Sequence, residues 1–232
     1  MRRNVAFTVF ELLVVVAIVA IVAGFAATSW QRAQQTNKIK TMAREIAGAI
    51  ELARSSAIQD EAVYGVYVNL GAGRNQDLCG TPLPANQPIT VFLDNVNLNC
   101  CLDPGETQIN LPADTSAANG LAWGATWAPV TVPTDQGTAA GNMAAGTSFP
   151  FIAAGVAPLL MFRQDGVPVM PNAVCTPGQV GSGTGAFYLT TNSAGPGAVV
   201  APSAARDYAV VVSPLGATRI HTYNRSTGAW TN

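Results

Sequence analysis

The sequence is poor in the residues from which active sites are built. Only 11% of its 232 residues are charged, and His221 is its single histidine. Between Asp114 and Arg163, Asp135 is the one ionisable side chain. No GxSxG, Walker A or HExxH motif occurs, and no second constellation supports a Ser-His-Asp triad. The sequence therefore predicts a protein that is not an enzyme, uses no cofactor and takes no small-molecule substrate.

The sequence also lacks the patterns of a metal site. Its four cysteines, Cys79, Cys100, Cys101 and Cys175, form no CxxC pair, and their spacing fits no common zinc module. Asp94, Asp103 and Glu106 supply oxygen ligands close together in sequence, as a calcium site requires, but turns also attract acidic residues. We therefore predict no metal.

If the chain is exported, its cysteines are expected to form two disulfides. Adjacent residues bridge only with strain, which disfavours a Cys100–Cys101 bond. We expect Cys79 to pair with one member of that pair and Cys175 with the other. The alternative is that all four are free, buried thiols.

A long apolar run lies near the N-terminus, and it contains one acidic residue. From Phe7 to Ala27 the run is about 31 Å long as a helix, enough to cross a hydrocarbon core. Arg2 and Arg3 precede it, which predicts a cytoplasmic start and an exported remainder. Placing the ionised Glu11 in lipid costs roughly 2.5–3.5 kcal/mol. Neither a cleaved secretory signal nor a simple membrane anchor explains that residue.

The stretch "FTVFELLVVVAIVAIVAGFA" resembles the class III signal and N-terminal helix of type IV pilins and pseudopilins. The resemblance implies that prepilin peptidase removes a leader by cutting between Ala6 and Phe7, and that the new amine of Phe7 is methylated. The family usually has glycine before the cut, where this chain has Ala6. The resemblance also implies that Glu11 meets the Phe7 amine of a neighbouring subunit, an ion pair that is strong in a low dielectric. The alternative is a carboxylate that stays neutral or reaches the membrane surface without a partner.

Apolar residues beyond the run indicate that the helix continues to about Gln59. They recur every three or four residues and form one stripe: Ile39, Met42 or Ala43, Ile46, Ile50, Ala53 and Ala57. Strand-like runs follow at 62–70, 88–94, 107–112, 158–166, 185–192, 207–214 and 217–224. The last two flank Ser213-Pro214-Leu215-Gly216, which suits a type I turn and predicts a hairpin.

Three stretches resemble the GspH/FimT-like minor pseudopilins. They are "MAREIAGAIELARSSAIQDEAVYGVYV" (42–68), "FRQDG" (162–166) and "ARDYAVVVSPLGATRI" (205–220). The resemblance implies an α+β, pilin-like fold in which one long N-terminal helix packs against a C-terminal antiparallel β-sheet. It divides the chain into a cleaved leader (1–6), a transmembrane and assembly helix (7–30), an amphipathic continuation (31–60) and a β-rich globular domain (61–232).

The resemblance implies a structural subunit of a type II secretion pseudopilus or a type IV pilus. Its partners would be other pilin or pseudopilin subunits, prepilin peptidase and the bacterial inner membrane, which it would span once with its C-terminus in the periplasm. After assembly it would lie in a periplasmic pseudopilus or a cell-surface pilus. A major pilin and a membrane-anchored periplasmic enzyme are alternatives.

Another alternative is a DNA-uptake receptor, for which Arg219, His221 and Arg225 are the candidate contacts. The net charge of −1 gives no general support for DNA binding. The competing expectation is that these three residues lie on a solvated face of the terminal hairpin, with His221 a surface residue of its strand.

Overall fold

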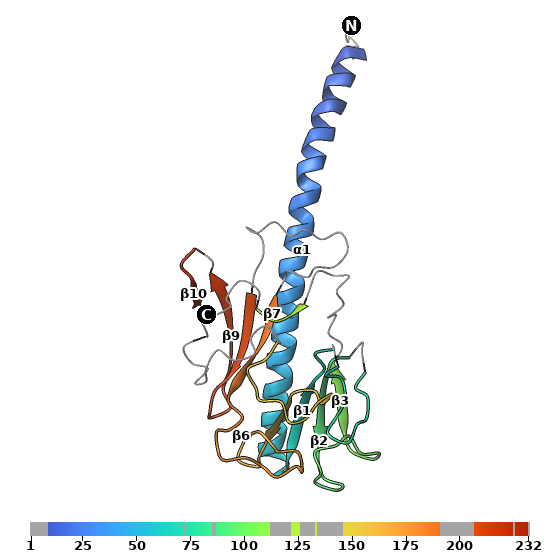
Figure 1. The fold of residues 1–232 in the computed structure, drawn as a ribbon. Helices are drawn as coiled ribbons and strands as arrows, with labels where there is room; N and C mark the ends of the chain where they lie inside the picture. Colours follow the sequence, from blue (N-terminus) through green and yellow to red (C-terminus); the bar gives the residue numbers. More distant parts are fainter. Residues whose placement is uncertain are drawn as a thin grey trace.

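The computed structural model describes residues 9–71, 73–84, 87–111, 122–125, 133, 146–190, 207–224 and 226–231. Helix α1 runs from Val9 to Gln59, and its N-terminal half projects away from the rest of the molecule (Figure 1). No proline occurs in this stretch, so every residue can take part in the helical hydrogen-bond ladder. The predicted helix, including its end at Gln59, is confirmed within the described residues.

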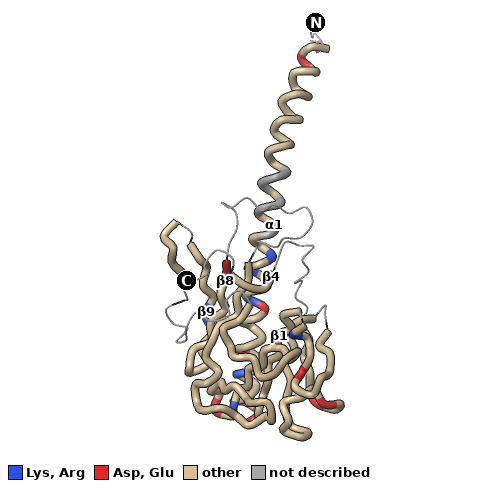
Figure 2. Tube along the Cα trace, viewed as in Figure 1, with Lys and Arg blue, Asp and Glu red and all other residues tan. Residues whose placement is uncertain are grey.

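The first part of α1, Val9–Ala26, is called the apolar segment here. None of it is buried inside the protein, and it is long and apolar enough to cross a membrane. At 1.5 Å per residue it measures about 27 Å, close to the roughly 30 Å of a hydrocarbon core. Glu11 is the only charged residue in the segment. Figure 2 shows red near the N-terminal end of α1 and tan along the rest of the segment.

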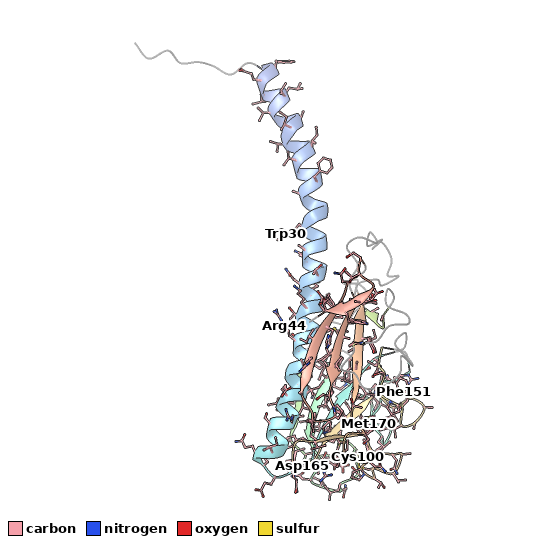
Figure 3. All side chains as sticks on the ribbon, turned by 90° about the vertical axis from the view of Figure 1, so that its left-hand side faces the viewer. Trp30, Arg44, Cys100, Phe151, Asp165 and Met170 are labelled. Atoms are coloured by element: carbon pink, nitrogen blue, oxygen red, sulfur yellow. A yellow bond between two sulfur atoms is a disulfide. The ribbon has the colours of Figure 1, made fainter. Side chains whose placement is uncertain are left out.

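The second part of α1 packs into the body of the protein, which comprises residues from Ile39 onward. Its buried side chains are those of the predicted stripe, and each is at most 3% exposed: Ile39, Met42, Ala43, Ile46, Ile50, Ala53 and Ala57. They share one hydrophobic core with strands from both sheets. Figure 3 shows the contrast between these packed side chains and those of the apolar segment, which stand clear of the body.

Two antiparallel sheets flank α1, each with five strands. The first sheet has the order β3-β2-β1-β5-β6, and the second has the order β10-β9-β8-β7-β4. The strands are β1 Tyr64–Val68, β2 Ile89–Leu93, β3 Gln108–Leu111, β4 Ala122–Trp123, β5 Leu159–Phe162, β6 Pro168–Val169, β7 Gly185–Thr190, β8 Asp207–Val212, β9 Thr218–Asn224 and β10 Ala229–Thr231.

Every strand predicted from the sequence is present, but the strands form two sheets where one was predicted. The apolar stripe of α1 is wide enough to contact β1 and β2 of the first sheet together with β8 and β9 of the second. The helix therefore provides the common core surface, and the strands divide into two sheets around it. Within the described residues, the sequence did not indicate β4, β6 and β10, which are each two or three residues long.

The predicted hairpin joins β8 to β9. The amide of Gly216 donates to the carbonyl of Ser213 at 2.9 Å, and the register places Val210 opposite Ile220. Gly216 has a φ of +81°, which glycine adopts without the steric cost that a side chain imposes.

The C-terminal end of α1 is fastened to turns of both sheets. Arg54 Nε donates to the carbonyl of Gly166, between β5 and β6, at 3.2 Å. The amide of Thr218, at the start of β9, donates to Glu51 Oε1 at 3.1 Å. A Cβ added at Gly216 would lie 2.8 Å from the Gly166 carbonyl oxygen and 3.0 Å from Arg54 Nε, so the turn needs glycine for space as well as for its φ. The helix and the two sheets are thereby held together at this end.

Candidate functional site

The apolar segment is the first candidate site because nothing in the body covers it. Phe10, Leu12 and Phe25 are 73%, 63% and 74% exposed, and they belong to a continuous apolar surface along the helix. Soluble monomers rarely expose apolar patches larger than a few hundred Å², so such a surface indicates contact with lipid or with another apolar partner. Glu11 lies in the first turn of α1 with an exposed side chain, where the helix dipole favours a negative charge.

The predicted processing site precedes the apolar segment. Ala6 and Phe7 lie outside the described residues, as does the whole predicted leader, 1–6. Cleavage before Phe7, methylation of its amine and its pairing with Glu11 of a neighbour therefore stay predictions.

Two disulfides fasten the loops of the first sheet. Cys79 pairs with Cys101 and Cys100 with Cys175, leaving no free cysteine. Their Cα–Cα distances are 5.7 and 5.5 Å, within the ordinary range for a disulfide. The expectation that Cys79 pairs with one of the two adjacent cysteines and Cys175 with the other is confirmed, and the two bonds join three loops.

The acidic residues that the sequence analysis weighed as calcium ligands organise a loop through backbone hydrogen bonds. Glu106 accepts the amides of Asn95 and Val96 at 3.2 and 3.3 Å through Oε1. Its Oε2 accepts the amide of Asp103 at 3.2 Å. These bonds hold residues 94–106 in a compact turn, and they account for acidic residues there without a cation.

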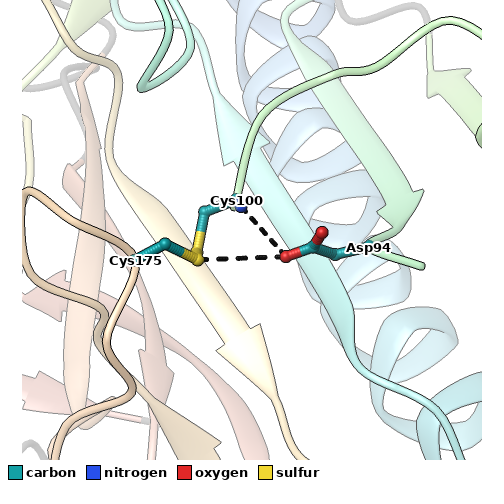
Figure 4. A group of neighbouring side chains, drawn as sticks. All are labelled: Asp94, Cys100 and Cys175. Atoms are coloured by element: carbon teal, nitrogen blue, oxygen red, sulfur yellow. Dashed lines mark hydrogen bonds between the residues drawn. A yellow bond between two sulfur atoms is a disulfide. The ribbon is translucent and has the colours of Figure 1, made fainter. Parts of the chain in front are cut away.

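Among the described residues, Asp94, Cys100 and Cys175 form the one group of potential metal ligands that converges (Figure 4). The two cysteines of this group are bonded to each other. A disulfide has no thiolate, which is the form of cysteine that binds metals. The group is consequently better described as a buried carboxyl beside a disulfide than as a metal centre.

Asp94 is the unusual member of that group. It is only 2% exposed, and its Oδ2 accepts the amide of Cys100 at 3.0 Å and lies 3.9 Å from Cys175 Sγ. Its other oxygen, Oδ1, is buried and has no hydrogen-bond partner. Burial raises the pKa of this carboxyl, and the nearby carboxylates of Glu106 and Asp103 raise it further, against the lowering effect of the Cys100 amide.

We expect Asp94→Asn to remove part of the pH dependence of stability. Because the folded protein raises the pKa of Asp94, the neutral carboxyl stabilises the fold at pH values below the unfolded pKa of about 3.9. That contribution is lost as pH rises through the folded pKa. The asparagine side chain of the variant cannot ionise, so the stability difference between variant and wild type should shift in favour of the variant as pH rises from about 3 to about 7. Denaturant unfolding of both proteins at several pH values measures this shift.

Asp77→Asn is the matched control for this prediction. Asp77 is also buried, but both of its oxygens accept backbone amides: those of Cys79 and Thr81 on Oδ1, and that of Leu102 on Oδ2. Asparagine has only one acceptor oxygen, so its NH₂ group would replace the other Asp77 oxygen and would face a backbone amide that it cannot accept. We expect Asp77→Asn to lower the free energy of unfolding by about 1–3 kcal/mol at neutral pH. A difference between Asp94→Asn and wild type that does not change with pH would contradict our account of Asp94.

A pocket of about 240 Å³ opens beside Asp94. Its walls come from the start of the first sheet, the 94–106 loop, β5, β6 and the segment that follows β6. The lining residues are Val63, Asp94, Leu98, Cys100, Met161, Arg163, Val169, Pro171, Cys175 and Pro177. Val63 follows the end of α1 closely in sequence, and Cys100 lies toward that end of the body in Figure 3. We call this the distal pocket, since it lies at the end of the body opposite the apolar segment.

Of the three candidate DNA contacts, the structure describes Arg219 and His221, and only Arg219 is exposed. His221 is 5% exposed and lies opposite Ala209 of β8, so its prediction as a surface residue of the strand is wrong. Ala209 belongs to a small hydrophobic core of the second sheet that also includes Tyr188. Arg219 is exposed on β9, and Arg225 lies outside the described residues.

No family model, curated protein or solved structure matches this chain. An apolar N-terminal helix and a disulfide-bonded β-sheet body are compatible with a pilin-like protein.

Sequence reasoning missed the distal pocket. Its lining residues come from segments separated by more than a hundred positions, and each segment taken alone has the composition of a loop or a core strand. The one available signal was the cysteine at 175, whose pairing with the 100–101 doublet brings the segment after β6 to the 94–106 loop.

Proposed function

We propose that this chain is a structural subunit of a type IV pilus-like filament, most consistent with a minor, GspH/FimT-like pseudopilin. In this proposal it is a single-pass inner-membrane protein before assembly, and its body faces the periplasm. It then leaves the membrane by packing its apolar segment among those of other subunits.

The apolar segment carries the proposal. It is unburied over its whole length, contains one acidic residue, and continues without a break into a helix that forms part of the body core. A flexible linker would let a membrane anchor and a soluble body move independently. A continuous helix instead fixes the body relative to the segment, so that packing of the segments also places the bodies in a regular array.

The alternatives receive less support. His221 is excluded as a contact of the DNA-receptor hypothesis, because a buried imidazole cannot contact a phosphate or a base edge. The major-pilin alternative uses the same assembly chemistry and differs only in the number of copies per filament. The stretches that resemble pseudopilins, 42–68, 162–166 and 205–220, favour the minor subunit.

The state of the N-terminus tests this proposal. We expect the chain from bacterial membranes to begin at Phe7 with a methylated amine, as intact-mass measurement and N-terminal sequencing would show. Ala6→Gly provides the matched variant, since it restores the residue that the family usually has before the cut, and it should be cleaved at least as fast as wild type. A mature chain that begins near Gly24 would instead indicate a soluble secreted protein and would overturn the proposal.

A further inference from the structure

A stretch of α1 just after the apolar segment carries positive charge and no negative charge. From position 27 to position 44 the sequence has no aspartate or glutamate and four cationic residues: Arg32, Lys38, Lys40 and Arg44. The two lysines in this group are the only lysines of the chain. The chain has 12 lysine and arginine residues in all, so a third of them lie in this short piece of one helix. Figure 2 shows blue on α1 where the helix enters the body.

Three of these cations lie on the same face of α1 as Trp30. At about 100° per residue, they lie within about 80° of Trp30 around the helix axis: Lys38, Lys40 and Arg44. Trp30 is 68% exposed, and the three cationic side chains are exposed as well. Ile39, which is fully buried, lies on the opposite side of the helix. Figure 3 shows Trp30 and Arg44 on the side of α1 away from the sheets. We call these four exposed residues the basic face.

Trp30 lies at the level where α1 would leave a membrane. It comes four residues after Ala26, the end of the apolar segment, which corresponds to about 6 Å along the helix axis. Tryptophan is enriched at the boundary between lipid and water, because its ring is apolar and its N–H can bond to water or to a headgroup. A bilayer that covers the apolar segment therefore has its headgroups near Trp30.

The two lysines lie within reach of those headgroups. Lys38 and Lys40 follow Trp30 by about 12 Å and about 15 Å along the helix axis. Side chains on a helix lean toward its N-terminus, which brings both ammonium groups back toward the membrane. An exposed charge acts over about 8 Å at physiological ionic strength. Arg44 follows Trp30 by about 21 Å and lies at the limit of that range. Within the described residues, no carboxylate pairs with Lys40 or Arg44.

We propose that the basic face binds the headgroups of anionic phospholipids while the chain is in the membrane. This inference rests on the membrane-bound stage of the proposed function, and it adds the class of lipid that the chain contacts. The charge of the basic face is complementary to that of a phosphate group, and the face continues directly from the apolar segment, which itself indicates contact with lipid. A tilt of α1 toward this face brings more of its cations to the membrane surface. Lipid binding thereby fixes the direction in which the body leans before assembly.

Native mass spectrometry of the full-length chain, released from lipid nanodiscs, tests the class of lipid. The nanodiscs contain equal parts of phosphatidylglycerol, which is anionic, and phosphatidylcholine, which has no net charge. We expect wild type to retain more phosphatidylglycerol than phosphatidylcholine. Lys38→Gln and Lys40→Gln should each lower this ratio by about fivefold, and Arg44→Gln should lower it by less. Because these side chains are exposed, the fold should survive. Arg163→Gln removes one charge beside the distal pocket and is the matched control, which should leave the ratio unchanged.

Fluorescence quenching tests the level assigned to Trp30. Phospholipids with bromine on the acyl chain, close to the headgroup, should quench part of the tryptophan emission of the wild-type chain. Trp30→Phe should remove this quenching, because the other three tryptophans come later in the chain, from Trp123 onward. Quenching that persists in Trp30→Phe would place another tryptophan at the membrane and would contradict the proposed position of the basic face.

The outcomes separate this inference from the proposed function. A preference for phosphatidylglycerol that is lost in the lysine variants and kept in Arg163→Gln would support the inference. Equal retention of both lipids by wild type would overturn it and leave the filament function standing. If the lysine variants keep the lipid preference but are absent from filaments, the basic face meets acidic side chains of a neighbouring subunit, and lipid binding is wrong. If the wild-type chain does not insert into bilayers, both proposals are overturned.

Discussion

Glu11→Ala should leave the chain inserted in the membrane and cleaved at Phe7, but nearly absent from filaments. The substitution removes the roughly 2.5–3.5 kcal/mol cost of placing a carboxylate in lipid, so insertion should be at least as efficient as in wild type. In the proposed filament it would leave the Phe7 amine of a neighbour without its counter-charge in an apolar environment. An unpaired buried charge costs several kcal/mol at each contact. Quantifying the chain in inner membranes and in sheared filaments measures the effect.

Two further variants separate charge from shape at this position. Glu11→Gln keeps the size of the side chain and loses the charge, so it should fail like Glu11→Ala. Glu11→Asp keeps the charge on a shorter side chain and should be intermediate. Normal incorporation of Glu11→Ala would mean that the carboxylate is dispensable, unless the chain lies at the filament tip with no subunit ahead of it. Labelling the tip in the same experiment distinguishes these two results.

Replacing Cys100 and Cys175 together by alanine should destabilise the body more than replacing Cys79 and Cys101. The bonds close loops with sequence separations of 75 and 22 residues. In the chain-entropy model, loops of these lengths correspond to about 4.5 and about 3 kcal/mol. The loop closed by the Cys100–Cys175 bond includes β3 and β5 of the first sheet. Removing this bond therefore gives a longer part of the unfolded chain more conformational freedom. Denaturant unfolding of the full chain in detergent compares the two variants.

The double replacements avoid a free thiol that would form new disulfides. Each removes one bond and leaves the other, and so each variant serves as the control for its counterpart. Equal losses of stability, or a larger loss for Cys79 and Cys101, would show that loop length does not govern the contribution of these bonds.

The elements of this fold were predictable because each is encoded locally. The apolar stripe from Ile39 to Ala57 has the period of a helix, and no proline interrupts it. The turn at Ser213–Gly216 specifies the hairpin between β8 and β9 through its own residues. These features require no knowledge of the rest of the chain.

The division into two sheets was not predictable in the same way. β1 pairs with β5, which lies more than ninety residues later, and nothing in either strand identifies the other as its partner. His221 illustrates the same limit at one residue. Its place on β9 was predicted, but its burial depends on the packing of Tyr188, Ala209 and their neighbours on the same face.

The segment from 71 to 157 lies outside the stretches that resemble pseudopilins, yet its described parts belong to the body. It provides β2 and β3 to the first sheet and both members of the Cys79–Cys101 disulfide. Asp77 and Glu106 hold its loops through backbone amides. The described parts of the segment are therefore integrated into both sheets, since its β4 pairs with β7 of the second sheet. Its 94–106 loop supplies Asp94, Leu98 and Cys100 to the distal pocket.

Mass spectrometry of sheared filaments from cells that express the wild-type chain tests the central claim most directly. The filament account predicts that the chain is recovered in this fraction together with other pilin-like subunits, and that its first residue is Phe7. Recovery of the chain only from the inner membrane, in cells whose filaments are otherwise intact and abundant, would contradict the claim. So would its recovery only as a soluble protein that has lost the apolar segment.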